Sequence, residues 1–334
     1  MKCFEQYLGN LDAMTTESNG EKIKSYIHPT LKNLGVINVV LLREAVAPVV
    51  FRNAEQEITD IEVDGEVYVR AVPNKFKYPE KNRGMQILRA YNVGGRLPQN
   101  KTVIGKKQSV SEVYDLNTFV FGDSAMREKN VLPVKSGVNY SDGLSLLPKH
   151  QCVDQTFHNR AFEDGTLFDA ESKKNSDNLF NRHFITPGTL MVQVLSSQGR
   201  LLPPEALDHL LLSIGVAGTY GGQTSVTGTN IRTSIVGVYG AKFERPASSP
   251  YEIIKALARY EADLTEPNEA EAAIHQMLSE AYETAMDGKE ARDYQTELVS
   301  RFENQDPSLE AQYKKAALKV GDLFDNWFGT GKKS

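Results

Sequence analysis

Residues 188–245 read GTLMVQVLSSQGRLLPPEALDHLLLSIGVAGTYGGQTSVTGTNIRTSIVGVYGAKFER, and this stretch decides the fold. The segment TLMVQVLSS, at 189–197, is largely apolar and predicts a strand. Prolines at 203–204 open a helix that Gly215 ends, because proline suits the first helical turn and glycine the C-terminal end. A glycine-rich loop follows, and the alternation that begins at Ile231 predicts a second strand. The stretch therefore predicts strand, helix, glycine loop and strand.

The first part of the chain supplies a matching half. Residues 36–52 are rich in valine and predict one long strand, or two short ones interrupted at Pro48. Asp-Gly at 64–65 is a two-residue turn signal between the strands of a hairpin. Residues 85–91 predict a short helix, which a glycine pair at 94–95 stops. The two halves can be assembled as a ferredoxin-like β-α-β-β-α-β unit with large insertions.

The predicted fold class is therefore α+β, with this core, large insertions and a C-terminal helical region. The middle of the chain has little long periodicity and many Gly, Asn, Asp, Ser and Lys residues, which indicates a loop-rich insertion and not a free-standing domain. The expected organisation is an N-terminal segment at 1–35, a core at 36–92 and 186–246 with a hairpin or lid insertion at about 53–82, an inserted subdomain at 93–185 and a helical region at 247–334.

Composition is that of an ordinary globular protein, with 334 residues, 40% hydrophobic and 24% charged. The longest apolar run, at 36–42, is far shorter than the ~20 residues that span a bilayer. The first twenty residues lack the apolar centre of a signal peptide. Two cysteines, Cys3 and Cys152, do not make a disulfide framework. We therefore expect a cytoplasmic protein without a membrane partner.

The net charge of −5 hides an uneven distribution. Residues 70–107 contain ten Lys or Arg and one acidic residue, whereas residues 247–334 contain 17 acidic residues and 10 Lys or Arg. Aromatic residues and glycines are interleaved with the cations of the basic segment. Such a mixture favours a surface that follows a nucleic-acid backbone and stacks on its bases. A solvated charged loop is the alternative.

The glycine loop has five glycines between Gly215 and Gly228, with several hydroxyl side chains. It has no lysine at the position that a phosphate-binding P-loop requires, and the dinucleotide-binding spacing GxGxxG is absent. Glycine lets the backbone of a partner come close, and hydroxyl, amide and peptide groups bind phosphate and sugar without choosing a base. The loop is either a track for a nucleic-acid polymer or a flexible surface loop.

Metal binding and catalysis have weak signals. His150, Cys152 and His158 lie within nine residues, but zinc requires four ligands and no CxxC pair is present. A metal-independent ribonuclease could use His158 or His183 as general acid or base, although nothing pairs either histidine with a nucleophile. We therefore expect no catalytic residue, no cofactor and no metal. His150, Cys152 and His158 are weak candidates for metal ligands.

Three segments resemble motifs of the CRISPR repeat-associated mysterious protein (RAMP) superfamily. NRGMQILRA, at 82–90, resembles its "KGxLR" helix start, and NTFVFGDS, at 117–124, resembles the "LFG" segment that follows. FNRHFITPGTLMVQVLS, at 180–196, resembles its entry into a strand, "NR…PPGTxF". The length, the acidic helical tail and the order of these motifs are most similar to the repeated backbone subunit of the type I-D CRISPR interference complex, Cascade.

The resemblance implies an RRM-like core with lid, insertion and helical subdomains. It also implies that copies polymerise head-to-tail along CRISPR RNA, hold its spacer for pairing with target DNA, and leave cleavage to another protein among the complex's other subunits. The alternative within the superfamily is a metal-independent endoribonuclease that processes CRISPR RNA. A protein–protein scaffold without nucleic acid is a third possibility.

The cations and the glycine loop are the candidate RNA-binding site. Tyr78, Tyr91 and Tyr220 are candidates for stacking on bases, and the alternative for each is a place in the core. The hairpin at 64–69 is a candidate for a finger that kinks the RNA, or else an ordinary sheet edge. The predicted RNA-binding residues are Lys75, Lys77, Lys81, Arg83, Arg89, Arg96, Lys101, Lys106, Lys107, Arg182, Tyr220, Gly221, Gly222, Asn230 and Arg232.

Overall fold

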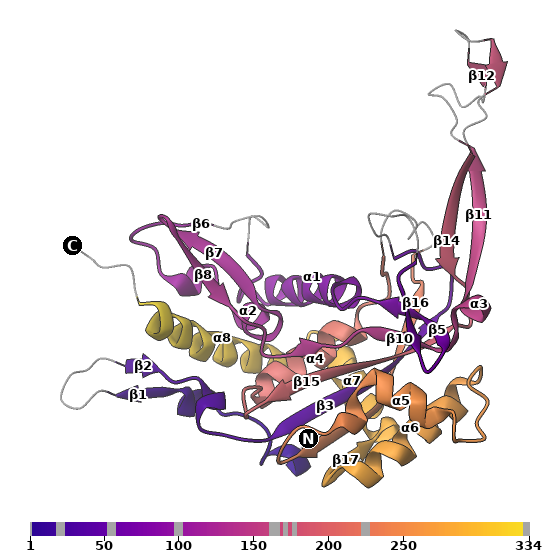
Figure 1. Cartoon of the computed structure of the whole chain (residues 1–334). Coiled ribbons are helices and arrows are strands. Elements are labelled where there is room, and N and C mark those ends of the chain that lie inside the picture. Colours follow the sequence, from indigo (N-terminus) through magenta and orange to yellow (C-terminus); the bar gives the residue numbers. More distant parts are fainter. Residues whose placement is uncertain are drawn as a thin grey trace.

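The computed structural model describes residues 2–17, 24–51, 58–96, 103–159, 168–169, 173–175, 179–221 and 228–329. An eight-stranded sheet, antiparallel throughout, lies at the centre of this mixed α+β fold (Figure 1). Its strand order is β17 (Thr284–Asp287), β16 (Ile231–Ala241), β3 (Val36–Ala45), β15 (Leu190–Gln198), β10 (Gly143–Pro148), β5 (Glu66–Ala71) and β4 (Asp60–Val63), with β9 (Asn139–Tyr140) paired to β15.

Strand β3 shows why the sheet is covered on both faces. It is buried along almost its whole length, between β15 and β16. Ile37, Val39 and Leu41 belong to one hydrophobic cluster, and Val40 and Leu42 belong to another. Successive side chains of a strand point to opposite faces, so each face of the sheet has its own core.

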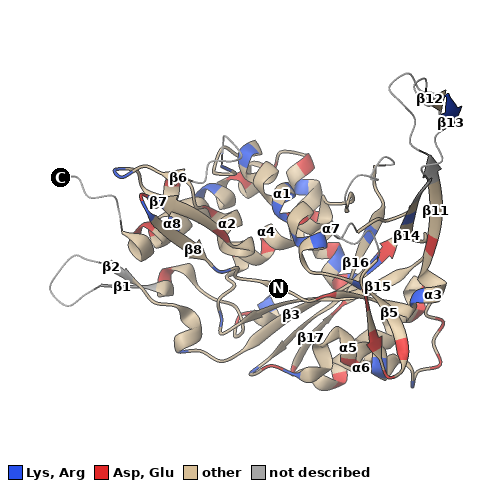
Figure 2. Cartoon of the chain, turned by 45° about the horizontal axis from the view of Figure 1, so that its top comes forward, with Lys and Arg blue, Asp and Glu red and all other residues tan. Residues whose placement is uncertain are grey.

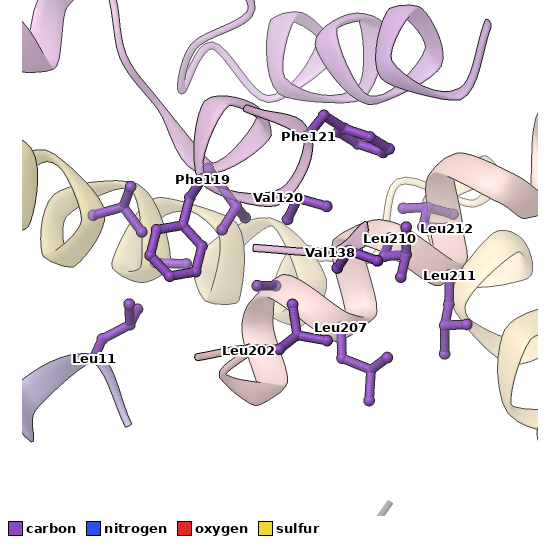
Figure 3. Close-up of a cluster of buried hydrophobic side chains, with 14 of the residues drawn as sticks. Leu11, Phe119, Val120, Phe121, Val138, Leu202, Leu207, Leu210, Leu211 and Leu212 are labelled. Atoms are coloured by element: carbon purple, nitrogen blue, oxygen red, sulfur yellow. The ribbon is translucent and has the colours of Figure 1, made fainter. Parts of the chain in front are cut away.

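Helices form a layer on each face. The first layer packs on the Leu41 side and contains α1 (Asn74–Ala90), α2 (Leu116–Phe121), α4 (Pro204–Gly215), α7 (Gly288–Glu303) and α8 (Pro307–Phe328). The second layer, on the Leu42 side, contains α5 (Pro250–Leu257) and α6 (Pro267–Ala281). Figure 3 shows side chains of α2, such as Phe119 and Val120, above Leu207 and Leu210 of α4.

The segment between α1 and β15 is more structured than its composition indicates. It contributes β10 to the central sheet and also forms a three-stranded sheet, a long hairpin and a small second hairpin. These elements are β6 (Val103–Ile104), β7 (Asp123–Arg127) and β8 (Asn130–Val134), then β11 (Val153–Asn159) with β14 (Leu179–Ile185), and β12 (Phe168–Asp169) with β13 (Lys174–Asn175). The β11–β14 hairpin projects from the body of the molecule (Figure 1).

Short elements complete the described chain. A two-stranded sheet near the N-terminus packs beside α8. The remaining elements are β1 (Thr15–Glu17), β2 (Lys24–Tyr26), α3 (Lys149–Cys152) and the 3-10 turns η1 (Lys2–Phe4), η2 (Leu11–Met14), η3 (Pro29–Leu31), η4 (Val110–Glu112) and η6 (Pro246–Ser248). No helix in the described ranges is long and apolar enough to cross a membrane.

The predicted α+β class is confirmed, and so are the elements with strong local signals. The strand at 36–45, the helix that begins at Pro204 and the strand that begins at Ile231 all form. Asp64 and Gly65, with φ of 52° and 88°, make the predicted turn between β4 and β5. This hairpin is the edge of the central sheet, so the finger-like projection is β11–β14 instead.

The predicted short helix at 85–91 is wrong in length, because α1 begins at Asn74 and continues through Pro79. The predicted helical region at 247–334 contains four helices in its described part and also the sheet strand β17. The other expected domain limits stay predictions.

Candidate nucleic-acid interface

A groove of about 330 Å³ lies between α1 and the start of the glycine loop. On α1 its side chains recur at intervals of three or four residues, which places them on one face of the helix. Its lining residues are Tyr78, Pro79, Asn82, Arg83, Met85, Gln86, Arg89, Thr219 and Gly221. The basic helix and the glycine loop, which are far apart in the sequence, therefore form the two walls of one groove.

Two of the predicted cations line this groove. Arg83 donates from Nη1 to Oε1 of Gln86 at 2.8 Å, in an exposed contact. Arg89 donates from Nε to the carbonyl oxygen of Gly95 at 2.7 Å, which ties the end of α1 to the following turn. Arg83 is therefore the more accessible cation, whereas Arg89 also has a structural role.

Other cations of α1 are partly withdrawn from water. Burial lowers the pKa of Lys75, and burial followed by the neighbouring Lys81 lowers the pKa of Lys77. The ammonium of Lys77 lies 5.9 Å from the centroid of the Tyr140 ring. Both lysines lie on α1, but neither is among the residues that line the groove.

Lys81 and Arg96 share one carboxylate. The ammonium of Lys81 donates to the carbonyl oxygen of Gly122 at 2.7 Å and lies 3.2 Å from Asp123. Arg96 lies 2.5 Å from the same carboxylate. These two predicted RNA-binding cations therefore connect α1 and the turn after it to the start of β7.

The remaining described cations lie away from the groove. Lys106 lies 3.6 Å from Glu128 beside the β6–β7–β8 sheet, and Lys107 is exposed next to it. Arg182 is exposed on β14 of the projecting hairpin. Figure 2 shows Lys and Arg distributed over several elements, so the predicted cations do not share a single furrow.

Arg232, at the start of β16, lies 3.0 Å from Glu44 and is also outside the groove lining. Lys101 and Gly222 fall outside the described residues.

The three tyrosines divide between surface and core. Tyr78 is 67% exposed and lines the groove, so its ring can receive a base. Tyr91 and Tyr220 are only 6% and 1% exposed. The expectation that Tyr91 or Tyr220 stacks on bases is therefore wrong, because both rings pack in the hydrophobic core.

The stem of the glycine loop is held by its own side chains. Asn230 is 1% exposed, and its amide accepts from the backbone N–H of Tyr220 at 2.9 Å and donates to the carbonyl oxygen of Tyr220 at 2.8 Å. The predicted contact of Asn230 with RNA is therefore wrong, since this side chain is used inside the protein. Gly221 has φ of +89°, and a Cβ there would lie 2.5 Å from the carbonyl oxygen of Val50, so only glycine fits without strain.

Asn82 and Gln86 line the groove and were not predicted from the sequence. Asn82 lies four residues after Tyr78, so a correct start for α1 would have placed both on one helical face. Gln86 lies within the predicted helix, three residues before Arg89.

The two weak metal candidates whose side chains the structure describes differ in exposure. His150 is exposed, whereas Cys152 is 2% exposed and its thiol donates to the carbonyl oxygen of Leu147 at 3.4 Å. Burial raises the pKa of the Cys152 thiol. The side chain of His158 lies outside the described part. Among the side chains that the structure describes, no three His, Cys, Asp or Glu residues are grouped to hold a metal ion.

His183, a candidate acid or base, lines a pocket of about 610 Å³ at the root of the β11–β14 hairpin, together with His150 and Asp154.

Solved structures show where this fold occurs. The chain is similar to the crystal structure of Thermofilum pendens Csc2, with a TM-score of 0.60 and 14% identity over 96% of this chain and 93% of that one. It also matches a chain of a CRISPR RNA-guided surveillance complex, in a pre-nicking form, with a TM-score of 0.47 and 11% identity over 74% and 88% of the two chains. The second likeness is too weak to establish a common fold. No curated protein matches the chain.

A sequence profile identifies the family. The profile of the Csc2 CRISPR family matches residues 24–315, which include the central sheet, both walls of the groove and the helices of both layers up to the first part of α8. This confirms the CRISPR relationship that the motifs of α1, α2 and β14–β15 predicted. The chain belongs to the Csc2 CRISPR family.

Proposed function

We propose that this chain is a non-catalytic, RNA-binding backbone subunit of a CRISPR interference complex. Copies of it polymerise head-to-tail along CRISPR RNA, present the spacer for pairing with target DNA, and contact the other subunits of the complex in the cytoplasm. The observation that carries this proposal is the groove in which α1 faces the glycine loop. Membership of the Csc2 CRISPR family supports it.

An RRM-like core is part of the proposal. Strands β16, β3, β15 and β10 are adjacent in this order, and α1 follows β3 as α4 follows β15. The chain order β3-α1-β10-β15-α4-β16 is that of a ferredoxin-like unit, with α1 and α4 on one face of the sheet. The remaining elements are then insertions and extensions of this unit.

The chemistry of the groove suits a strand of variable sequence. Arg83 can neutralise a phosphate, and the exposed ring of Tyr78 can stack on any base. Thr219 and Gly221 offer a hydroxyl group and close approach to the backbone. None of these contacts selects a base, as a subunit that holds different spacers requires.

The proposed head-to-tail polymerisation is explained by the direction of the RNA strand. RNA has a direction, so identical grooves along it place successive copies in a head-to-tail relation, which extends without closing. The projecting β11–β14 hairpin is available for contacts beyond the body of its own protomer. Its exposed Phe157, at 61%, supports a role in such contacts.

Fluorescence anisotropy with a labelled single-stranded RNA tests the groove. Arg83→Gln should weaken binding and reduce the slope of log affinity against log salt by about 0.7, because one phosphate contact is lost from a single strand. Arg259→Gln is the matched control, since Arg259 is exposed beyond α5 in the opposite helical layer. It should bind as the wild type does.

Equal salt slopes in the wild type and Arg83→Gln would contradict the groove assignment. Specific cleavage of CRISPR repeat RNA by the wild type, lost in His183→Ala, would instead favour the processing endoribonuclease.

A further inference from the structure

A fully buried ion pair lies beneath the groove. Arg43 of β3 and Glu80 of α1 are both 0% exposed, with Nη1 2.7 Å from Oε1. The hydroxyl of Tyr220 donates to Oε1 of Glu80 at 2.9 Å and accepts from Nη1 of Arg43 at 3.2 Å. Tyr140 donates to the other oxygen of Glu80 at 2.6 Å. One set of hydrogen bonds therefore joins the central sheet, α1 and the stem of the glycine loop.

Arg43 also donates to side chains of two neighbouring strands. Nε and Nη2 donate to Oε1 of Gln193 on β15, at 3.2 and 2.8 Å, and Nη1 donates to the hydroxyl of Thr233 on β16 at 2.8 Å. Burial alone would lower the pKa of Arg43, but Glu80 and then the Tyr220 hydroxyl more than offset burial, so its pKa is raised. The guanidinium therefore stays charged and fixed in position.

Stability alone does not account for this arrangement. Desolvation offsets much of the attraction between two buried charges, and apolar replacements of a buried pair are often as stable as the pair. The ion pair does fix the position of Tyr220, which directly precedes Gly221 in the groove wall. Glu80 lies on the buried side of α1, whereas Tyr78 and Arg83 line the groove on the same helix.

We propose that Arg43, Glu80 and Tyr220 are positioning residues that hold the loop stem against α1, at the spacing that admits a single RNA strand. This inference rests on the proposed function. The second strand of the stem is fixed as well, since Asn230 bonds to both backbone groups of Tyr220. The groove is thus preorganised before RNA arrives, and binding does not have to order its stem.

The variant Tyr220→Phe tests the anchor, because it removes the hydroxyl and keeps the ring. We expect about tenfold weaker binding of a fluorescein-labelled single-stranded RNA of mixed sequence. The salt slope should not change, because the anchor neutralises no phosphate. Hydrogen exchange at the backbone amides of Tyr220 and Asn230 should become faster.

Two further variants separate positioning from general stability. Tyr282→Phe is the matched control, because its hydroxyl accepts from the buried Asn38 amide at 2.9 Å and its ring packs in the opposite core. It should lower the melting temperature, because a buried hydrogen bond is lost, and bind RNA as the wild type does. The double variant Arg43→Met/Glu80→Leu removes both charges together, so no unpaired charge remains. It should unfold cooperatively and bind at least as weakly as Tyr220→Phe.

The outcomes distinguish the anchor from the proposed function. Wild-type affinity and wild-type exchange in Tyr220→Phe and in the double variant would overturn the anchor and leave RNA binding intact. An equal loss of affinity in Tyr282→Phe would also overturn it, since the effect would then be general destabilisation. Absence of RNA binding by the wild type would refute the proposed function, and with it any positioning role in binding.

Discussion

His209 and Asp208 are neighbours on α4, and folding shifts the pKa values of their side chains in opposite directions. Burial lowers the pKa of His209 to about 3, and its ring lies 3.1 Å from the hydroxyl of Tyr313 and 3.1 Å from the amide oxygen of Asn117. Burial raises the pKa of Asp208 to about 6, although the hydroxyl of Tyr294 donates to it at 2.6 Å and opposes that rise. The folded protein therefore keeps a neutral histidine next to a carboxyl group that is easily protonated.

We predict that these two residues act oppositely on acid stability. In the unfolded chain the pKa of His209 is about 6.5, which is above its folded value of about 3. The stability that the neutral ring contributes is therefore lost as the pH falls from about 6.5 to about 3. Asp208 contributes stability below about 3.9, which is lost as pH rises through about 6. His209→Gln should reduce the slope at which the free energy of unfolding falls with falling pH, by up to about 1.4 kcal/mol per pH unit. Asp208→Asn should make this slope steeper.

Urea unfolding of the wild type and both variants, from about pH 6.5 down to about pH 4, measures these slopes. Parallel curves for all three proteins would show that neither side chain titrates differently on folding.

At the scale of single residues, the sequence predicts chemistry better than it predicts burial. Tyr220 and Asn230 belong to a glycine loop rich in hydroxyl groups. This composition suits a loop that binds RNA, and it suits equally a loop whose stem is held by internal hydrogen bonds. Tyr220 bonds to Arg43 and Glu80, two charged residues far away in the sequence, and Asn230 bonds to the backbone of Tyr220. Nothing in the local pattern distinguishes a buried charge pair from two surface charges.

At the scale of elements, α1, α2 and α4 meet at Gly84. A Cβ at this position would lie 2.1 Å from Oδ1 of Asn117, 2.9 Å from Nε2 of His209 and 2.9 Å from the hydroxyl of Ser213. The glycine in the motif at 82–90 is therefore required by helix packing.

We predict that Gly84→Ala destabilises the protein by about 1–3 kcal/mol, despite the better helix propensity of alanine, because it overpacks this contact. Gly105→Ala is the control, since a Cβ there makes only ordinary contacts with Gln108, the nearest atom at 3.6 Å. Chemical denaturation followed by circular dichroism measures both. A stability of Gly84→Ala equal to that of Gly105→Ala would contradict the close packing.

Elements with local signals were predictable, and elements that depend on partners were not. The unit β15–α4–β16 follows from prolines, glycines and alternation within one stretch. Strand β10 has only six residues and ends at Pro148, so its place depends on pairing with β5 and β15. The first half of α1 was missed because Pro79 interrupts a polar sequence.

The groove was predictable only in its parts. The basic segment and the glycine loop were each recognised from composition, but their meeting follows from the packing of α1 against the loop stem. The long β11–β14 hairpin was missed because the histidine, asparagine and aspartate residues around it are typical of loops.

At the scale of the whole molecule, charge is divided among elements instead of being collected in one furrow. Lys81 and Arg96 hold the packing beside Asp123, whereas Arg83 remains accessible in the groove. The overall charge of −5 is compatible with the proposed RNA binding, because the local field of the groove acts on a strand that would lie in it. In the proposed function, the face with α5 and α6 lies outside the RNA path.

The most direct test of the central claim is photochemical cross-linking of the protein to RNA that co-purifies with it, followed by mass spectrometry of the linked peptides. We expect this RNA to carry CRISPR spacer and repeat sequence. The groove assignment predicts cross-links on the α1 peptide that contains Tyr78 and on the peptide that contains Thr219 and Gly221. Cross-links confined to α5 and α6, on the opposite face of the sheet, would contradict it.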